Sequence, residues 1–445
     1  MYIIGNGKVF TRDANNPYIE DGAVVFDGKL IKEVGKLQDL KAKYIDAEFI
    51  DANGQYIMPA FINVHNHIYS ALGRGISIKN HNPTNFIEIL EGLWWNLDNH
   101  LKLKDSEMSA RATYINCIEN GVTTIFDHHA SYGETLGSLK VIGDIAKEYG
   151  VRSCLCYEVS DRHGEEKMKE AVKENVDFYN YTKNDSSDML KAMMGLHASF
   201  TLSDKTMEYV IKNTPSDCGY HIHVEEGLDD VIDAKEKYNT TVVERLNDLK
   251  ILGPNTMAVH CIHGTKKELD ILKETDTIVV HNPESNMGNA VGAPNAIEIF
   301  KTGVLYGLGT DGYTNDMLES YKVANCLQKH DRKDPSCAWM EIPTMLFENN
   351  AEIANRFFKI PLGKLKEGYS ADIILVDYTP LTPMNENNLN SHLLFGINGS
   401  MVTSTIGSGK ILMRDRKLVN IDKSAVLEES RMVANDLWKR INNGR

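Results

Sequence analysis

No stretch of this sequence approaches the ~18 consecutive apolar residues that span a bilayer, and its first residues lack the charged-then-apolar layout of a signal peptide. Cysteine is scarce: there are seven, an odd number, and no CxxC pair. This count does not favour a disulfide framework. Several cysteines lie in apolar, strand-like runs, so we expect reduced thiols in a cytoplasmic protein.

Basic residues are in deficit. Lys and Arg number 48 against 62 Asp and Glu, which leaves a formal net charge of −14. So acidic a chain is a poor partner for nucleic acid or an anionic membrane, and we expect a small-molecule substrate instead. The 42% share of hydrophobic residues is ordinary for a globular protein and sufficient for a large core.

From about residue 60, short apolar runs alternate with segments of helical periodicity. Phe86, Leu90, Trp94 and Leu97, for example, recur at helical spacing. The eight apolar runs are 61–67, 122–129, 151–158, 191–198, 219–226, 256–263, 277–282 and 304–311. Each is followed by room for a helix. Eight such units predict an α/β fold, a (β/α)₈ TIM-like barrel over residues 59–361.

The two ends of the chain have a different texture. Residues 1–58 show the pattern of short strands with Gly or Asn-Gly turns. The same pattern returns within residues 362–445, which end in an amphipathic helix. A separate β domain at each end would explain this. Because the two flanks are so alike, we prefer one small β-sandwich built from both.

Histidines gather where the predicted strands end. The set is His65, His67, His128, His129, His197, His221, His223, His260 and His281, and Asp311 ends the eighth run. In a barrel all these ends meet at the face where active sites lie. A single strand histidine is more often part of the core. So many at one rim favour a function, because imidazole is costly to bury without a partner.

His65 and His67 stand two residues apart, so both side chains leave the same face of a strand and can chelate one metal ion. A catalytic metal site also needs a further nitrogen, often a carboxylate, and an open position for water. His223 and Asp311 can supply the nitrogen and the carboxylate.

Six motifs then carry a family resemblance. They read PAFINVHNHIYSALGRG, GLHASFTLSD, HIHVEEG, AVHCIHG, HNPESNMGN and GLGTDG, each at a predicted strand end. Over nearly its whole length the chain resembles the amidohydrolase superfamily. It is most similar to the deaminase and chlorohydrolase branch (the ATZ/TRZ-like enzymes), and within that branch to the SsnA-type aminohydrolases.

The resemblance implies roles for particular residues. It implies metal ligation by His65, His67, His223 and Asp311, proton transfer by Glu226 with Asp311, polarisation of the attacked centre by His260, and substrate contact by His197. It also implies that His221, His281 and Asn282 support the ligands from behind.

Two-metal members of the superfamily carry a bridging modified lysine at the end of the fourth strand. That position reads GLHAS here, and Lys191 lies at the start of the strand. We therefore expect one divalent ion per chain, Zn²⁺ in the first place and Fe²⁺ as the alternative.

Several assignments stay open. Glu225 is the alternative to Glu226 as proton carrier, since neighbouring residues of a continuing strand point to opposite faces. The triplet from Asp127 to His129 has no counterpart in the common deaminase pattern, and we expect His128 to contact the substrate.

The long segment 68–104, which follows the first barrel strand, should cover the site. Within it, Arg74 could contact an anionic or carbonyl group, although a structural salt bridge explains it equally well. Trp94 could stack on a flat ring, although an aromatic residue on a helix stripe is more often part of the core.

We therefore expect a metal-dependent aminohydrolase that removes an amino group from a planar nitrogen heterocycle or an amidine by means of activated water. The alternatives are a hydrolase that opens a cyclic amide, a chlorohydrolase, and a binding protein built on an inactive barrel. We also expect a homodimer.

Overall fold

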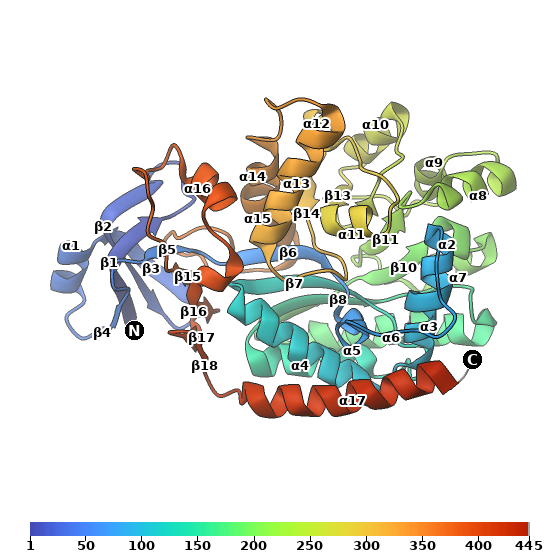
Figure 1. The fold of residues 1–445 in the computed structure, drawn as a ribbon, viewed down its shortest axis with the longest axis horizontal. Coiled ribbons are helices and arrows are strands. Elements are labelled where there is room, and N and C mark those ends of the chain that lie inside the picture. Colours follow the sequence, from blue (N-terminus) through green and yellow to red (C-terminus); the bar gives the residue numbers. More distant parts are fainter. Residues whose placement is uncertain (444–445) are drawn as a thin grey trace.

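Two parallel sheets close into one barrel at the centre of the molecule (Figure 1). The computed structural model describes residues 1–443. One sheet has the order β6-β7-β8-β9 and the other the order β10-β11-β12-β13-β14. Single bridges close the ring, from Val159 to Leu196 on one side and from Asn66 to Asp311 on the other. Since β9 pairs with β8 and β10 with β11, these two short strands share one of eight positions. The predicted barrel is confirmed.

The observed strands match the predicted apolar runs. They are β6 (Phe61–Asn66), β7 (Val122–His129), β8 (Arg152–Tyr157), β9 (Leu190–Ala192), β10 (Met194–Ala198), β11 (Tyr220–Val224), β12 (Met257–His260), β13 (Ile278–His281) and β14 (Tyr306–Leu308). The helices that follow them are α4 (Leu103–Glu119), α5 (Ser138–Tyr149), α6 (Gly164–Lys183), α7 (Asp204–Asn213), α8 (Leu228–Tyr238), α9 (Val242–Asp248), α10 (Lys266–Glu274), α11 (Pro283–Gly288), α12 (Ala296–Lys301), α13 (Met317–Arg332), α14 (Glu341–Thr344) and α15 (Asn350–Phe357).

Helix α10 shows how local sequence sets these elements. Thr265 accepts a hydrogen bond from the backbone N–H of Glu268, and the Glu268 carboxylate accepts one from the backbone N–H of Thr265. This reciprocal pair satisfies donors that the first turn of a helix leaves unpaired. Leu269 and Leu272 then bury the apolar face of the helix against the barrel.

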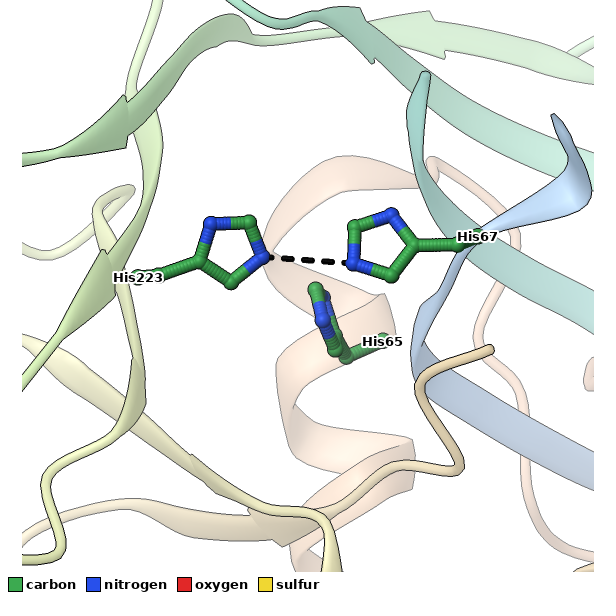
Figure 2. Close-up of side chains that lie close together, drawn as sticks. All are labelled: His65, His67 and His223. Carbon is green, nitrogen blue, oxygen red and sulfur yellow. Dashed lines mark hydrogen bonds between the residues drawn. The ribbon is translucent and has the colours of Figure 1, made fainter. Parts of the chain in front are cut away.

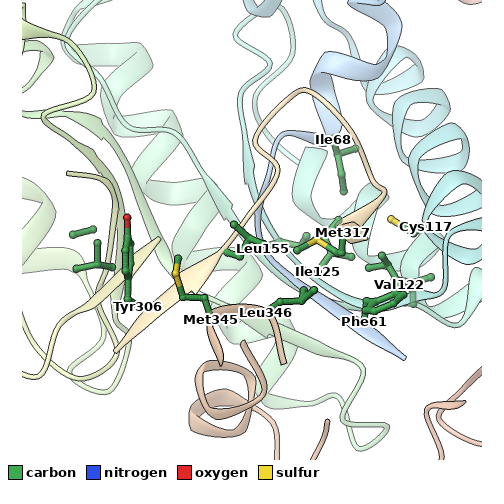
Figure 3. Packing of buried hydrophobic residues seen from close by; sticks show 14 of the residues in the cluster. Phe61, Ile68, Cys117, Val122, Ile125, Leu155, Tyr306, Met317, Met345 and Leu346 are labelled. Carbon is green, nitrogen blue, oxygen red and sulfur yellow. The ribbon is translucent and has the colours of Figure 1, made fainter. Parts of the chain in front are cut away.

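Alternation along the strands separates two apolar cores. On β8, Leu155 lies in the large cluster between strands and helices (Figure 3), whereas Cys154 and Cys156 lie in the cluster inside the barrel. On β11, Ile222 joins the outer cluster. His221 and His223, its two neighbours in the strand, therefore face inward, because successive side chains point to opposite faces.

The two ends of the chain build one mixed sheet beside the barrel (Figure 1). Its strands are β1 (Tyr2–Phe10), β2 (Tyr18–Asp27), β3 (Leu30–Lys36), β4 (Glu48–Asp51), β5 (Tyr56–Pro59), β15 (Ile373–Val376), β16 (Val402–Gly407), β17 (Lys410–Arg414) and β18 (Lys417–Leu418), with α1 (Leu37–Lys43) and α16 (Leu389–Phe395) beside them. Strand β5 pairs with β1 in parallel and with β15 in antiparallel fashion, which joins the two halves. Shared construction by both flanks is thus confirmed.

The last helix, α17 (Lys423–Asn443), runs beneath α4 and reaches α3 (Trp95–His100) (Figure 1). The Trp438 indole N–H donates to the Leu72 carbonyl at 2.7 Å, and Arg440 pairs with Asp105. The helix therefore packs on the barrel, although it follows the strands of the terminal sheet. The boundaries proposed at 58/59 and 361/362 stay predictions. Within residues 1–443, no helix is long and apolar enough to cross a membrane.

A buried ion pair ties the barrel to the terminal sheet. Arg152 of β8 donates to the Asp372 carboxylate at 2.7 Å and to the Ser370 hydroxyl at 2.5 Å. Asp372→Asn removes the charge that balances a buried guanidinium, so it should lower the free energy of unfolding by about 3–5 kcal/mol. Urea denaturation measures the change. The exposed Asp415→Asn, in the turn between β17 and β18 of that sheet, should stay within about 0.5 kcal/mol of wild type. Equal effects of the two variants would contradict this role.

Candidate active site

The carboxyl ends of the barrel strands surround a pocket. Among the residues singled out from the sequence, those that line it are His67, His197, His223, Glu226, Asp311 and Trp94. His65 and His260 lie at its base and are fully buried. The fold thus brings together side chains from five separate strands or strand ends, which is how barrel active sites are built.

His65, His67 and His223 form a compact group of possible metal ligands (Figure 2), and Asp311 lies beside them. Nε2 of His67 lies 3.3 Å from Nε2 of His223 and 3.2 Å from Oδ1 of Asp311. Nε2 of His65 lies 4.0 Å from Oδ2 of Asp311 and has no hydrogen-bond partner among the described residues. In a tetrahedral site with bonds of about 2.0–2.1 Å, ligand atoms lie about 3.3 Å apart, so the spacing fits a small divalent cation.

In His67 and His223, a hydrogen bond at Nδ1 leaves Nε2 facing the other possible metal ligands. Nδ1 of His67 donates to the His128 carbonyl at 2.6 Å, and Nδ1 of His223 donates to the His197 carbonyl at 2.9 Å. Each Nε2 therefore carries a lone pair. Two lone pairs and a carboxylate oxygen that converge at this distance would repel one another, and a bound cation removes that repulsion.

The His65 ring is held by His221, whose Nε2 lies 2.8 Å from Nδ1 of His65. Burial lowers the pKa of His65 and of His223 well below the usual value, and burial also lowers the pKa of His221 to about 3. These rings are therefore neutral near pH 7, which is the form that binds metals. His221 thus lies behind the possible ligand His65, where the sequence predicted a supporting residue.

Asp311 enters the group from the loop after β14. Its backbone N–H donates to the His65 carbonyl at 3.0 Å, and its φ of 55° turns the chain at that point. The Gly312 N–H donates to its Oδ1 at 2.7 Å. These contacts fix the carboxylate against His65 and His67. The last barrel strand, β14, thus meets the first, β6, at the site.

Glu226, and not Glu225, faces the pocket. Strand β11 ends at Val224, and Glu225 has a φ of 50°, so strand alternation stops there. The Glu225 side chain turns away from the pocket; burial, and after it the neighbouring Glu268, raise its pKa to about 9. Burial, and after it the charge of Asp311, raise the pKa of Glu226 to about 8.

His260 stands between Glu226 and Asp311. Its Nε2 lies 3.5 Å from Oε2 of Glu226 and 3.5 Å from Oδ2 of Asp311. Its Nδ1 donates to Oδ1 of Asn286 at 2.9 Å, which holds the ring in place. Nε2 of the neutral ring therefore carries the lone pair; it can take a proton from either carboxylate and, once protonated, donate it to a ligand between them.

The remaining predicted residues fall into different positions. His197 and Trp94 line the pocket, whereas Arg74 is exposed, ends the 3₁₀ helix η1 (Ile68–Gly73) and is absent from the lining. The structure therefore does not bring Arg74 to the pocket, because the chain turns outward after η1. His128 is fully buried behind His223, with ring centroids 4.6 Å apart, and does not line the pocket either.

The triplet from Asp127 to His129 has a structural function that the sequence did not indicate. The Asp127 carboxylate accepts a hydrogen bond from the Ile68 N–H at 2.5 Å, next to His67, and the His128 carbonyl binds the His67 ring. The end of β7 therefore positions His67 from two sides, and neither contact is a substrate contact.

His281 ends β13, and Asn282 follows it directly. Both are fully buried, and no hydrogen bond of the described residues reaches their side-chain nitrogen and oxygen atoms. Gly309 lies between Asn282 and His65. A Cβ added to Gly309 would be 2.5 Å from Oδ1 of Asn282 and 2.8 Å from the Cβ of His65, so only a glycine fits between them.

Other residues join the site without having been singled out. Asn289 donates to Oε1 of Glu226 at 3.3 Å, and Asn286 holds His260. Both belong to the motif HNPESNMGN, where they follow Asn282 by four and seven residues. This is helical spacing, and it could have indicated that one face of α11 points at the site.

The segment 68–104 forms one wall of the pocket, as predicted. It contributes Tyr69, Phe86, Leu90, Trp94 and Trp95. Trp95 also packs edge-on against His197, with ring centroids 5.9 Å apart. A flat ring would therefore find aromatic and aliphatic surfaces opposite the charged base of the pocket.

Comparison with known proteins gives consistent matches. The sequence profile of the amidohydrolase family matches residues 56–412. A 5'-deoxyadenosine deaminase of Methanosarcina mazei is 30% identical, with 99% of each chain covered. A 5-methylthioadenosine/S-adenosylhomocysteine deaminase of Thermococcus sibiricus is 30% identical over 92% of this chain and 93% of its own.

Solved structures share the fold. An adenosine deaminase from Xanthomonas campestris with bound zinc has a TM-score of 0.87 at 21% identity, covering 98% of both chains. The zinc complex of atrazine chlorohydrolase from Arthrobacter aurescens has a TM-score of 0.81 at 21% identity, covering 98% of this chain and 100% of its own. At this level of identity the two structures support the architecture alone.

Proposed function

Because the chain belongs to the amidohydrolase family, we propose that it is a metal-dependent aminohydrolase that deaminates an adenine nucleoside. The observation that carries the proposal is the convergence of His65, His67, His223 and Asp311, with Glu226 and His260 directly beside them. The relatives that cover nearly the whole chain are named as deaminases of 5'-deoxyadenosine and of 5-methylthioadenosine.

The four converging residues would hold one Zn²⁺ ion, with Fe²⁺ as the alternative. Three imidazole nitrogens and one carboxylate are a donor set that zinc accepts readily, and imidazole also suits iron. The fourth strand offers no lysine at its carboxyl end, where Leu196 and His197 stand, and this supports a single ion. When bound, such a metal lowers the pKa of water from 15.7 to about 7 and so makes hydroxide available at neutral pH.

The chain's own residues would manage the protons. Glu226 accepts the proton of the attacking water and returns it to the departing amine; its raised pKa suits both tasks near neutral pH. Asn289 orients that carboxylate. His260 directs Nε2 at the attacked carbon's substituents and stabilises the charge that develops there.

The purine ring would lie against Trp94 and His197. Nδ1 of His197 shares a hydrogen bond with the Thr201 hydroxyl at 2.8 Å, so Nε2 is left for a ring nitrogen. The aromatic wall of segment 68–104 excludes water from the ring faces. The closer likeness to SsnA-type aminohydrolases, the homodimer and the cytoplasmic location stay predictions.

Release of ammonia tests the proposal. Metal-replete protein should release ammonia from adenosine or 5'-deoxyadenosine, and mass spectrometry should show one NH replaced by O. A product heavier by a whole water would instead indicate ring opening, and chloride release from a chlorotriazine would indicate a chlorohydrolase. Absence of ammonia over adenine nucleosides, free purines and pyrimidines would refute a deaminase.

A further inference from the structure

A second charged group lies in the pocket wall, away from the metal ligands. Glu158 follows β8 and lines the pocket, with 4% of its side chain exposed. One of its oxygens pairs with Arg162, whose guanidinium also binds Asp98 at 2.9 Å. Trp95 covers Arg162, with the guanidinium carbon 4.7 Å from the ring centroid. The cation is therefore enclosed by its partners, and only the glutamate reaches the pocket.

The carboxylate has free capacity toward the pocket. Its Oε1 accepts from Arg162, and no hydrogen bond of the described residues reaches its Oε2. Although burial favours the neutral form, His197 and Arg162 lower the pKa of Glu158 below its usual value. An ionised carboxylate accepts hydrogen bonds and donates none, so it suits hydroxyl or ammonium groups.

The charge balance of the group is negative. Two carboxylates, Glu158 and Asp98, share the single guanidinium of Arg162. No lysine or arginine belongs to the pocket lining given by the described residues, whereas three acidic side chains do: Glu158, Glu226 and Asp311. A carboxylate or phosphate on a ligand would therefore face like charge and find no partner.

The position of Glu158 fits the tail of a ligand and not its reacting end. Glu158 follows β8, the third strand position, whereas Glu226 follows β11, the fifth, and is held by Asn289 beyond β13, the seventh. The two carboxylates therefore enter the pocket from different strand ends, with His197 of the fourth position between them. A ligand whose amino group lies at Glu226 would extend its substituent past His197 toward Glu158.

We propose, on the basis of the proposed function, that Glu158 makes the pocket select nucleosides with a neutral, hydroxyl-bearing tail and exclude those that carry a carboxylate or phosphate. The sugar hydroxyls would donate to the carboxylate, and the enclosed Arg162 would hold that carboxylate in position.

Substrate competition measures this selection. The value of kcat/KM is determined for two neutral substrates, adenosine and 5'-deoxyadenosine, and for two anionic ones, adenosine 5'-monophosphate and adenosine-5'-carboxylate. The wild-type protein should prefer the neutral pair by about 100-fold or more. Glu158→Gln should shrink this preference by about 10-fold or more, because it removes the repelling charge and weakens sugar binding.

Glu158→Gln leaves Arg162 paired with Asp98, so the variant should fold, and its melting curve and metal content verify this. The matched control is Glu166→Gln, an exposed residue in α6 just beyond the same strand, which should leave the preference unchanged. Turnover of either anionic substrate within about 10-fold of adenosine by the wild type would overturn the inference but not the deaminase. An unchanged preference in a folded Glu158→Gln would overturn it as well. No ammonia from any of the four would refute the proposed function and this inference with it.

Discussion

Glu226→Gln is expected to lower kcat by about 10³–10⁴-fold while the metal content stays near that of wild type. The substitution keeps the size of the side chain and the contact with Asn289, but an amide cannot accept the proton of the attacking water. The loss should appear in kcat more than in KM, because the missing interaction belongs to the transition state. Steady-state kinetics with parallel metal analysis gives both values.

Glu225→Gln is the matched control. That side chain points to Glu268 and not to the pocket, so turnover should fall by less than about 10-fold. Abolished turnover in Glu225→Gln with little change in Glu226→Gln would show that the two glutamates have the opposite roles.

His223→Ala is expected to lose most of the bound metal and, with it, turnover. The substitution removes one of the three imidazole nitrogens that would bind the metal, the one that lies 3.3 Å from Nε2 of His67. The exposed-face His330→Ala, in the last turn of α13, should keep both metal and activity. Elemental analysis and ammonia release report the two properties, and full occupancy in active His223→Ala protein would remove this residue from the metal site.

Removal and return of the metal tests the number of ions. Chelated protein should be inactive, and titration with Zn²⁺ should restore activity up to about one equivalent per chain, as a site with four protein ligands and one open position requires. A break at two equivalents would show a second ion, which the absence of a lysine at the end of the fourth strand argues against.

Much of the architecture follows from local pattern. Each of the eight apolar runs became a strand position, because short, nearly continuous apolar segments followed by amphipathic helices can be buried on both faces only in a parallel sheet. The alternation in β11 likewise predicts that His221 and His223 share a face. For the same reason, the spacing of His65 and His67 predicts that these two side chains also share a face.

Alternation ceases to predict orientation where the strands end. Glu225, His260 and Asp311 all have positive φ values, so the chain changes direction at each of them. For this reason the sequence left Glu225 and Glu226 as alternatives, whereas the structure directs the first at Glu268 and the second at the pocket.

By itself, then, the sequence determined the barrel, the shared terminal sheet and the strand ends that carry the histidines, since hydrophobic periodicity and residue type are local properties. Only the tertiary structure decided which side chains meet. It enclosed Arg162 between Asp98, Glu158 and Trp95, and it placed the backbone carbonyl of His128 on the ring of His67. Such contacts join residues far apart in the chain, and they depend on how the barrel closes, which no local pattern records.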